Sequence, residues 1–138
     1  MRNILIVLLS FIFISLSAQE KKSFQLSSHI LDISKGKPVE DVFIELQKYN
    51  DNTKQWDSLD KKKTDKNGRI TDFLPYHTNE KNNKGNFKLV FFIEEYYNKQ
   101  NIESFYPYIE VIFQIKDQEH YHVPITLSPF GYSTYRGS

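Results

Sequence analysis

From Phe24 onward, apolar side chains recur at every second residue in one stretch after another, and this period restricts most strongly what the chain can fold into. In the first stretch, residues 24, 26, 28 and 30 alternate with residues 25, 27, 29 and 31. A period of two places alternate side chains on opposite faces of a β-strand, whereas a helix needs a period of 3.6. The same alternation returns in residues 42–47, 87–93 and 109–115. It predicts half-buried strands.

Turn signals separate these stretches. They are SKGKP at 34–38, DKNG at 65–68, whose Asn and Gly tolerate positive φ, and SP at 128–129. Four further strands are predicted at 55–60, 69–73, 121–127 and 130–135, a polar loop at 78–85, and one short helix at 94–101, which lacks alternation. We therefore predict one all-β domain: an eight-stranded, two-sheet antiparallel β-sandwich with one short helix.

The N-terminus has the pattern of a targeting segment. Arg2 is the only charge before Glu20, and residues 4–14 read ILIVLLSFIFI. A positive start, a short apolar run and the small residue Ala18 are typical of a secretory signal peptide, with cleavage before Gln19. A membrane anchor is the alternative, but the run is too short to span a bilayer unaided. We predict a signal peptide at 1–18, a domain at 19–138, and a periplasmic or secreted protein that leaves the membrane on cleavage.

Composition excludes several classes of protein. The chain has no Cys, so disulfides, thiolate metal sites and cysteine nucleophiles are excluded. Its formal net charge is +1, whereas a nucleic-acid-binding domain shows a basic stripe. Aromatic residues make up 15% of the chain, which disfavours disorder.

The candidates for chemistry are the four histidines, at 29, 77, 120 and 122, and a few arginines. His120 and His122 share one face of a strand, as a metal-binding pair would, but an exposed polar face is the simpler explanation. No third ligand is evident nearby, although the fold could bring His29 close. His29 shares its face with Ser27 and Leu31, and Ser133 shares its face with Tyr135. Knowing which face of its strand each residue occupies does not by itself join these residues into one site.

The C-terminal stretch, YSTYRGS at 132–138, carries two Tyr up to the last residues. A frayed tail is usually polar and poor in aromatics, so this tail has the composition of a docked segment whose terminal Ser138 belongs to a site. The other interpretation is an edge strand that simply ends the sandwich.

Three segments carry a family resemblance. LSSHILD at 26–32 followed by GKP at 36–38, TDKNGR at 64–69, and HYHVP at 120–124 followed by LSPFGYSTYRGS at 127–138 are similar to the transthyretin-like proteins. The terminal YRGS at 135–138 separates the 5-hydroxyisourate hydrolases of that family from its hormone carriers. Two departures are visible: Asn67 stands in place of the usual Asp, and PITL at 124–127 replaces the usual PLLL, so that Thr126 adds a hydroxyl on the face of His122.

The resemblance implies an eight-stranded sandwich that assembles as a homotetramer, with active sites in a channel at the dimer–dimer interface. It implies hydrolytic ring opening of 5-hydroxyisourate to the ureidoimidazoline carboxylate, in urate and purine catabolism, without metal or cofactor. His29, Arg69, His122 and Ser138 are the implied catalytic residues, and His29, Arg69 and Tyr135 the implied substrate-binding residues. Two alternatives stay open: a transthyretin-type small-molecule carrier and a secreted structural β-sandwich.

Overall fold

The computed structural model describes residues 23–77 and 82–138, and the segment predicted to be a signal peptide lies outside them. Within these residues the elements are β1 (Phe24–Asp32), β2 (Lys37–Pro38), β3 (Phe43–Asn50), β4 (Gln55–Lys63), β5 (Arg69–Pro75), β6 (Gly85–Phe91), α1 (Glu94–Asn98), β7 (Ile109–Ile115), β8 (Tyr121–Ser128) and β9 (Gly131–Thr134). No helix in the described part of the chain is long and apolar enough to cross a membrane.

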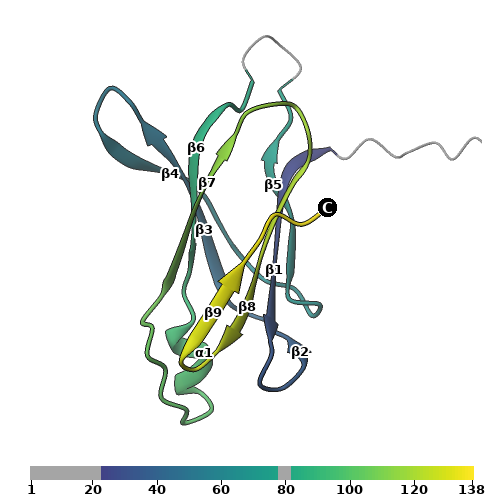
Figure 1. Ribbon diagram of the computed structural model, residues 1–138, viewed down its shortest axis with the longest axis vertical. Helices are drawn as coiled ribbons and strands as arrows, with labels where there is room; N and C mark the ends of the chain where they lie inside the picture. The colour runs from purple at the N-terminus through teal and green to yellow at the C-terminus, as the bar shows by residue number, and fades with distance from the viewer. Residues whose placement is uncertain (1–22, 78–81) are drawn as a thin grey trace, which may run out of the picture.

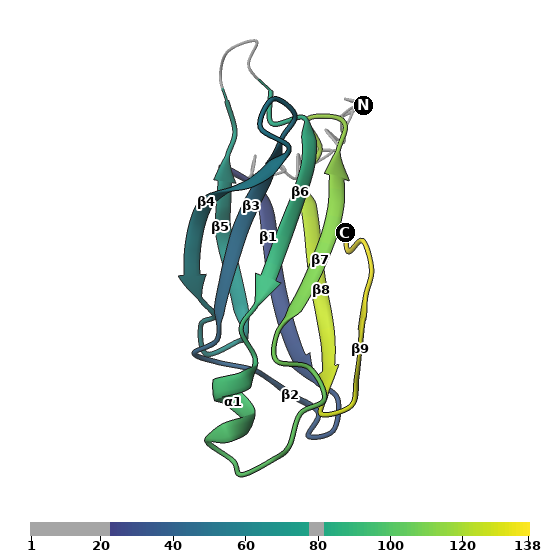
Figure 2. The same cartoon turned by 90° about the vertical axis from the view of Figure 1, so that its left-hand side faces the viewer.

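The strands form two sheets that pack face to face, as the sequence predicts (Figures 1 and 2). One sheet has the order β5–β1–β8–β9, with the two-residue β2 paired to the end of β1. The other has the order β4–β3–β6–β7. All strand pairs are antiparallel except β1 and β8, which run parallel from Leu26 opposite Tyr121 to Asp32 opposite Leu127. The two-sheet sandwich is confirmed, and the parallel pair is a feature that alternation did not predict.

The core lies between the sheets and consists of the inward side chains that alternation indicates. Leu26 and Ile30 of β1 are fully buried, and so are Ile44 of β3 and Phe87 of β6. Burying one such side chain contributes about 1.5–3 kcal/mol through the hydrophobic effect. The outward residues of β1, β5 and β8 are consequently free to be polar without cost to this core.

The predicted helix and third strand differ from the structure only in length. The helix ends at Asn98 instead of Asn101, because the chain turns over residues 99–101 and Asn101 takes a positive φ of 54°. The strand that begins at Gln55 continues to Lys63, since its whole length pairs with β3. Both differences lie at the sandwich surface and leave the layers unchanged.

One hydrogen-bond cluster joins β1 to α1. The Asp32 carboxylate accepts hydrogen bonds from the Tyr96 hydroxyl at 2.7 Å, the Ser34 backbone N–H at 2.9 Å and the Lys35 N–H at 3.2 Å. Figures 1 and 2 place α1 at the end of the sandwich where β2 and the β8–β9 turn also lie. The cluster therefore fixes the turn after β1 to that end.

Candidate functional site

A hollow of about 570 Å³ lies on the outer face of the β5–β1–β8 sheet. In Figure 1 the chain runs on from β9 to the C-terminus near β1. Its lining combines polar side chains from three strands with the end of the chain. The lining residues are Ser23, Phe24, Ser27, Ser28, Arg69, Thr71, His120, His122, Tyr135, Gly137 and Ser138.

The parallel pairing of β1 and β8 brings a serine between two histidines. Ser27 lies opposite His122 in the register, and its Oγ lies 2.8 Å from His122 Nδ1 and 2.9 Å from His120 Nε2. His120 Nδ1 lies 3.0 Å from the Phe24 carbonyl oxygen. Ser27 is buried, with 8% of its surface exposed, so the three side chains form a partly enclosed polar cluster at the floor of the hollow.

A tight turn places Arg69 at the edge of the hollow. The Asp65 carboxylate accepts hydrogen bonds from the backbone N–H groups of Asn67 and Arg69, at 2.8 and 2.9 Å. Gly68 has a φ of +70°, and a Cβ there would lie 2.6 Å from the Ile30 carbonyl oxygen. Only glycine fits this close approach between the turn and β1. The turn is thereby held against β1, and Arg69 begins β5 at an exposed position.

His29 lies directly opposite Arg69 in the antiparallel register of β1 and β5. It does not line the hollow, and its side chain is half-buried on the same outward face as Ser27. Burial lowers the pKa of His29, and the positive charge of Arg69 lowers it further, while a hydrogen bond with the Asn67 backbone and the Asp65 carboxylate oppose the shift. This environment favours the neutral imidazole.

The end of the chain is docked on His122. The Gly137 N–H donates to the His122 carbonyl oxygen at 2.8 Å, in an antiparallel bridge between the two residues. The Arg136 guanidinium lies over the Tyr121 ring, 4.5 Å from its centroid. These contacts confirm that the tail continues beyond the edge strand β9 and packs back onto β8.

The residues implied by the family resemblance thus fall into two groups. Arg69, His122, Tyr135 and Ser138 meet at the hollow, whereas His29 lies beside Arg69. Two further side chains that the alternation along their strands places on this face lie outside the hollow. Thr126 and Ser133 face each other across the β8–β9 pair, 2.5 Å between their hydroxyl oxygens.

Ser27 and Thr71 line the hollow but were not among the predicted site residues. Ser27 carried a signal, because strand parity already places it on the face of His29. Nothing in the sequence marked Thr71. His77 follows β5 and is not part of the hollow. Over residues 23–77 and 82–138, no group of three or more His, Cys, Asp or Glu side chains is placed to hold a metal ion.

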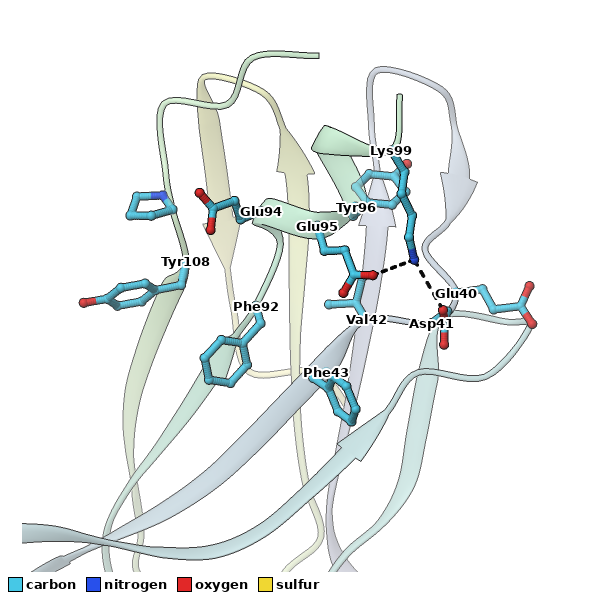
Figure 3. A pocket seen from close by; sticks show the side chains of 11 residues that line it. Glu40, Asp41, Val42, Phe43, Phe92, Glu94, Glu95, Tyr96, Lys99 and Tyr108 are labelled. Atoms are coloured by element: carbon cyan, nitrogen blue, oxygen red, sulfur yellow. Dashed lines mark ion pairs between the residues drawn. The ribbon is translucent and has the colours of Figure 1, made fainter. Parts of the chain in front are cut away.

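A second cavity lies beside α1 and is lined by aromatic rings and carboxylates (Figure 3). Its carboxylates Glu95 and Asp41 both face Lys99, at 2.9 and 3.8 Å, and Asp41 also pairs with Lys63 at 2.7 Å. These ion pairs join α1 to the start of β3. No histidine or arginine lines this cavity, so it lacks the imidazole and guanidinium groups that line the first hollow.

A two-sheet sandwich with this strand order, and with histidines and the docked chain end on one outer face, is a transthyretin-like domain. Residues 26–137 match the family model of the HIUase/Transthyretin family, and the chain belongs to that family. A probable 5-hydroxyisourate hydrolase of Caenorhabditis elegans is 46% identical over 114 residues, which cover 82% of this chain and 81% of that protein.

Solved structures with the same fold fall on both sides of the family. The 5-hydroxyisourate hydrolase of Klebsiella pneumoniae superposes with a TM-score of 0.66 at 32% identity, covering 82% of this chain and 98% of the other. Sea bream transthyretin, solved in complex with thyroxine, superposes with a TM-score of 0.72 at 26% identity, covering 82% and 94%. The fold alone therefore does not separate hydrolase from carrier, and the site residues must do so.

Proposed function

We propose that this chain is a 5-hydroxyisourate hydrolase, which opens the ring of 5-hydroxyisourate in urate breakdown. The observation that carries the proposal is the docking of the terminal YRGS segment on His122, within one hollow that Arg69 also lines. The identity to the C. elegans hydrolase, over most of both chains, supports the same activity. A carrier has no need of a histidine, an arginine and a chain terminus at one place.

The reaction is the addition of water to a ring carbonyl followed by cleavage of the amide C–N bond. His122 takes a proton from the attacking water and later returns it to the departing ring nitrogen. The opened ring then carries a carboxylic acid, which ionises to the carboxylate by losing its own proton to solvent. General acid–base catalysis of this kind contributes typically ~10²–10⁴-fold. His29 is the partner that its lowered pKa keeps neutral, and therefore able to accept a proton or a hydrogen bond, near pH 7.

Arg69 supplies the positive charge that the transition state needs. Its planar guanidinium offers parallel N–H donors to the carbonyl oxygens of a flat ring and stabilises the oxyanion as it forms. The Tyr135 ring stacks on the substrate or donates its hydroxyl to it. Ser138 lines the same hollow, and its hydroxyl or its carboxylate is assigned to positioning the water.

Two further proposals concern the setting of the enzyme. We propose a homotetramer in which the hollow faces a second subunit at the dimer–dimer interface, because the side chains of the hollow are turned outward from the sandwich. We propose export to the periplasm or the exterior, on the strength of the apolar segment at residues 4–14 and Ala18.

An absorbance time course tests the activity. Urate is oxidised by a uricase to generate 5-hydroxyisourate, and the purified protein is added. We expect the intermediate to disappear faster than in buffer. Arg69→Lys keeps the positive charge but loses the parallel N–H donors of the guanidinium, and is expected to lower the rate by at least ~10-fold. Lys66→Ala removes an exposed charge from the same turn and is the matched control. An unchanged decay with correctly folded protein would contradict the hydrolase and favour a carrier.

A further inference from the structure

A chain of three hydrogen bonds connects the backbone of β1 to the ring of His122. It runs from the Phe24 carbonyl oxygen to His120 Nδ1 at 3.0 Å, from His120 Nε2 to Ser27 Oγ at 2.9 Å, and from Ser27 Oγ to His122 Nδ1 at 2.8 Å. All three distances are those of ordinary hydrogen bonds. The chain begins at a group that can only accept, and when both histidines are neutral this fixes the direction of every proton along it.

The direction follows from the number of protons that each group owns. A carbonyl oxygen has no proton, so His120 Nδ1 carries the hydrogen that points at Phe24. In the neutral ring His120 Nε2 is then an acceptor, and the Ser27 hydroxyl donates to it. A hydroxyl has only one proton, so the bond between Ser27 Oγ and His122 must use the Nδ1–H of His122. The neutral His122 ring therefore carries its proton on Nδ1 and its lone pair on Nε2.

We propose that Ser27 and His120 are positioning residues that hold His122 in the tautomer whose Nε2 accepts a proton. This inference rests on the proposed function, in which His122 takes a proton from water. It adds two residues to that reaction, neither of which needs to touch the substrate. The hydrogen bond made by one ring nitrogen of a histidine decides which nitrogen is protonated, and here His122 donates that bond from Nδ1–H to Ser27 Oγ.

The fold makes this arrangement rigid. Ser27 and His122 are register partners in the parallel β1–β8 pair, and Ser27 is buried. His120 is attached to the backbone of β1 through Phe24, three residues before Ser27. On the other side, a Cβ on Gly137 would lie 2.5 Å from His122 Cδ2, so the docked tail lies against the opposite edge of the ring. The ring has little freedom to turn over and exchange its two nitrogens.

Nitrogen NMR of the substrate-free protein tests the tautomer directly. In protein labelled with ¹⁵N-histidine, long-range proton–nitrogen correlations distinguish a protonated Nδ1 from a protonated Nε2. The spectra are recorded at a pH where the ring is neutral, and His120→Phe identifies the His120 signals. We expect His122 to carry its proton on Nδ1. A His122 protonated on Nε2 in the unaltered protein would overturn the proposal.

Variants connect the tautomer to catalysis. Ser27→Ala removes the acceptor, and we expect the Nε2–H form of His122 to appear and kcat to fall by at least ~10-fold with little change in KM. Ser27→Thr keeps a hydroxyl and is expected to keep both the tautomer and most of kcat. The matched control is Ser128→Ala, which deletes a β8 hydroxyl bonded to the Gly131 carbonyl at 2.9 Å, away from the hollow.

The outcomes separate this inference from the proposed function. If Ser27→Ala leaves the His122 tautomer or kcat unchanged, the positioning role is wrong, although the enzyme can still be a hydrolase. If the unaltered protein does not accelerate loss of 5-hydroxyisourate, the proposed function fails, and the tautomer measurement still decides what Ser27 and His120 do to the ring.

Discussion

The ring of His122 is restrained from two sides and its backbone from a third. Ser27 meets Nδ1, and Gly137 both faces Cδ2 and donates its N–H to the His122 carbonyl oxygen. Catalytic groups need this degree of restraint, because misplacement by about 1 Å can cost ~10²-fold in rate. Two of the restraining residues are small, so single-atom changes at each of them test the arrangement.

Gly137→Ala adds one methyl group where there is no room for it. The new Cβ would lie 2.5 Å from His122 Cδ2, so either the ring or the tail must move. We expect kcat to fall by ~10–100-fold while the melting temperature changes little, since the tail lies outside the core. Gly131→Ala is the control, because its Cβ would make an ordinary contact of 3.6 Å with Ser128 Oγ. A Gly137→Ala protein with the parental rate would show that the docked tail has no part in catalysis.

The pKa of His29 can also be tested at the scale of a single residue. Burial and the charge of Arg69 both favour the neutral ring, so an NMR titration should give a pKa below 6.5. Arg69→Gln should raise that pKa toward 6.5, whereas Lys66→Gln, in the same turn, should leave it in place. Because the folded pKa is lowered, protonation of His29 destabilises the fold: this cost is absent above pH 6.5 and develops as the pH falls through the folded pKa. A His29 that titrates at or above 6.5 would contradict this interpretation.

Elements show what the sequence can and cannot predict. Alternation predicted the strands and their faces, including the shared face of Ser27 and His29, because a period of two is a property of each strand alone. It did not predict that β1 and β8 run parallel, since partner and direction depend on contacts far apart in the chain. That one pairing places Ser27 beside His122. Alternation alone could therefore identify candidate histidines and arginines but could not join them into one site. That grouping was implied by the family resemblance, and the role of Ser27 beside His122 needed the fold.

Asp32 links two elements, and its charge is expected to stabilise the sandwich. Burial acts to raise its pKa, but hydrogen bonds from Ser34, Tyr96 and the Lys35 backbone outweigh burial and lower it below 3.8. Burial, together with the hydrogen bond to Asp32, raises the pKa of Tyr96 to about 12, so the phenol keeps its proton. The stabilisation is fully present above about pH 3.8 and disappears as the pH falls through the lowered value.

Asp32→Asn tests this contribution. Hydrogen bonds to a charged group are typically worth about 1.5–3 kcal/mol, so we expect the variant to lose roughly that much unfolding free energy at pH 7 in urea titrations. The loss should shrink at pH 3, because below 3.8 the carboxylate of the unfolded parent is protonated and the contribution of the charged group to stability declines. Asp51→Asn changes an exposed carboxylate in the β3–β4 turn and should have little effect at either pH. An equal loss at pH 7 and pH 3 would mean that shape, and not charge, is what Asp32 supplies.

At the scale of the whole molecule, the hollow is incomplete as a reaction chamber. Arg69 is exposed, and Tyr135 is 59% exposed, on an outer face that the single chain leaves open to water. Electrostatic stabilisation of an oxyanion is strongest where water is excluded. Large exposed apolar side chains lie on the edge strand of each sheet, with Ile112 of β7 61% exposed and Tyr132 of β9 41% exposed. The open hollow and the exposed apolar side chains on the edge strands both favour burial of these surfaces against further copies of the chain.

We therefore expect a homotetramer whose subunits cover the hollow, and activity that depends on assembly. Sedimentation velocity should give four times the mass of one chain, and the rate per chain should fall when dilution dissociates the tetramer. Ile112→Lys places a charge on an edge strand of the sheet that does not carry His122, so it should weaken assembly and lower the rate together, while the isolated sandwich keeps its circular dichroism spectrum. Because Ile112 and Tyr135 line one cavity, the loss of rate must follow the loss of tetramer as the protein concentration is varied. Lys116→Glu, an exposed change of charge just after β7, is the comparison for non-specific charge effects. A monomer with undiminished turnover would mean that one chain completes the site alone, and that the open face is sufficient for the chemistry.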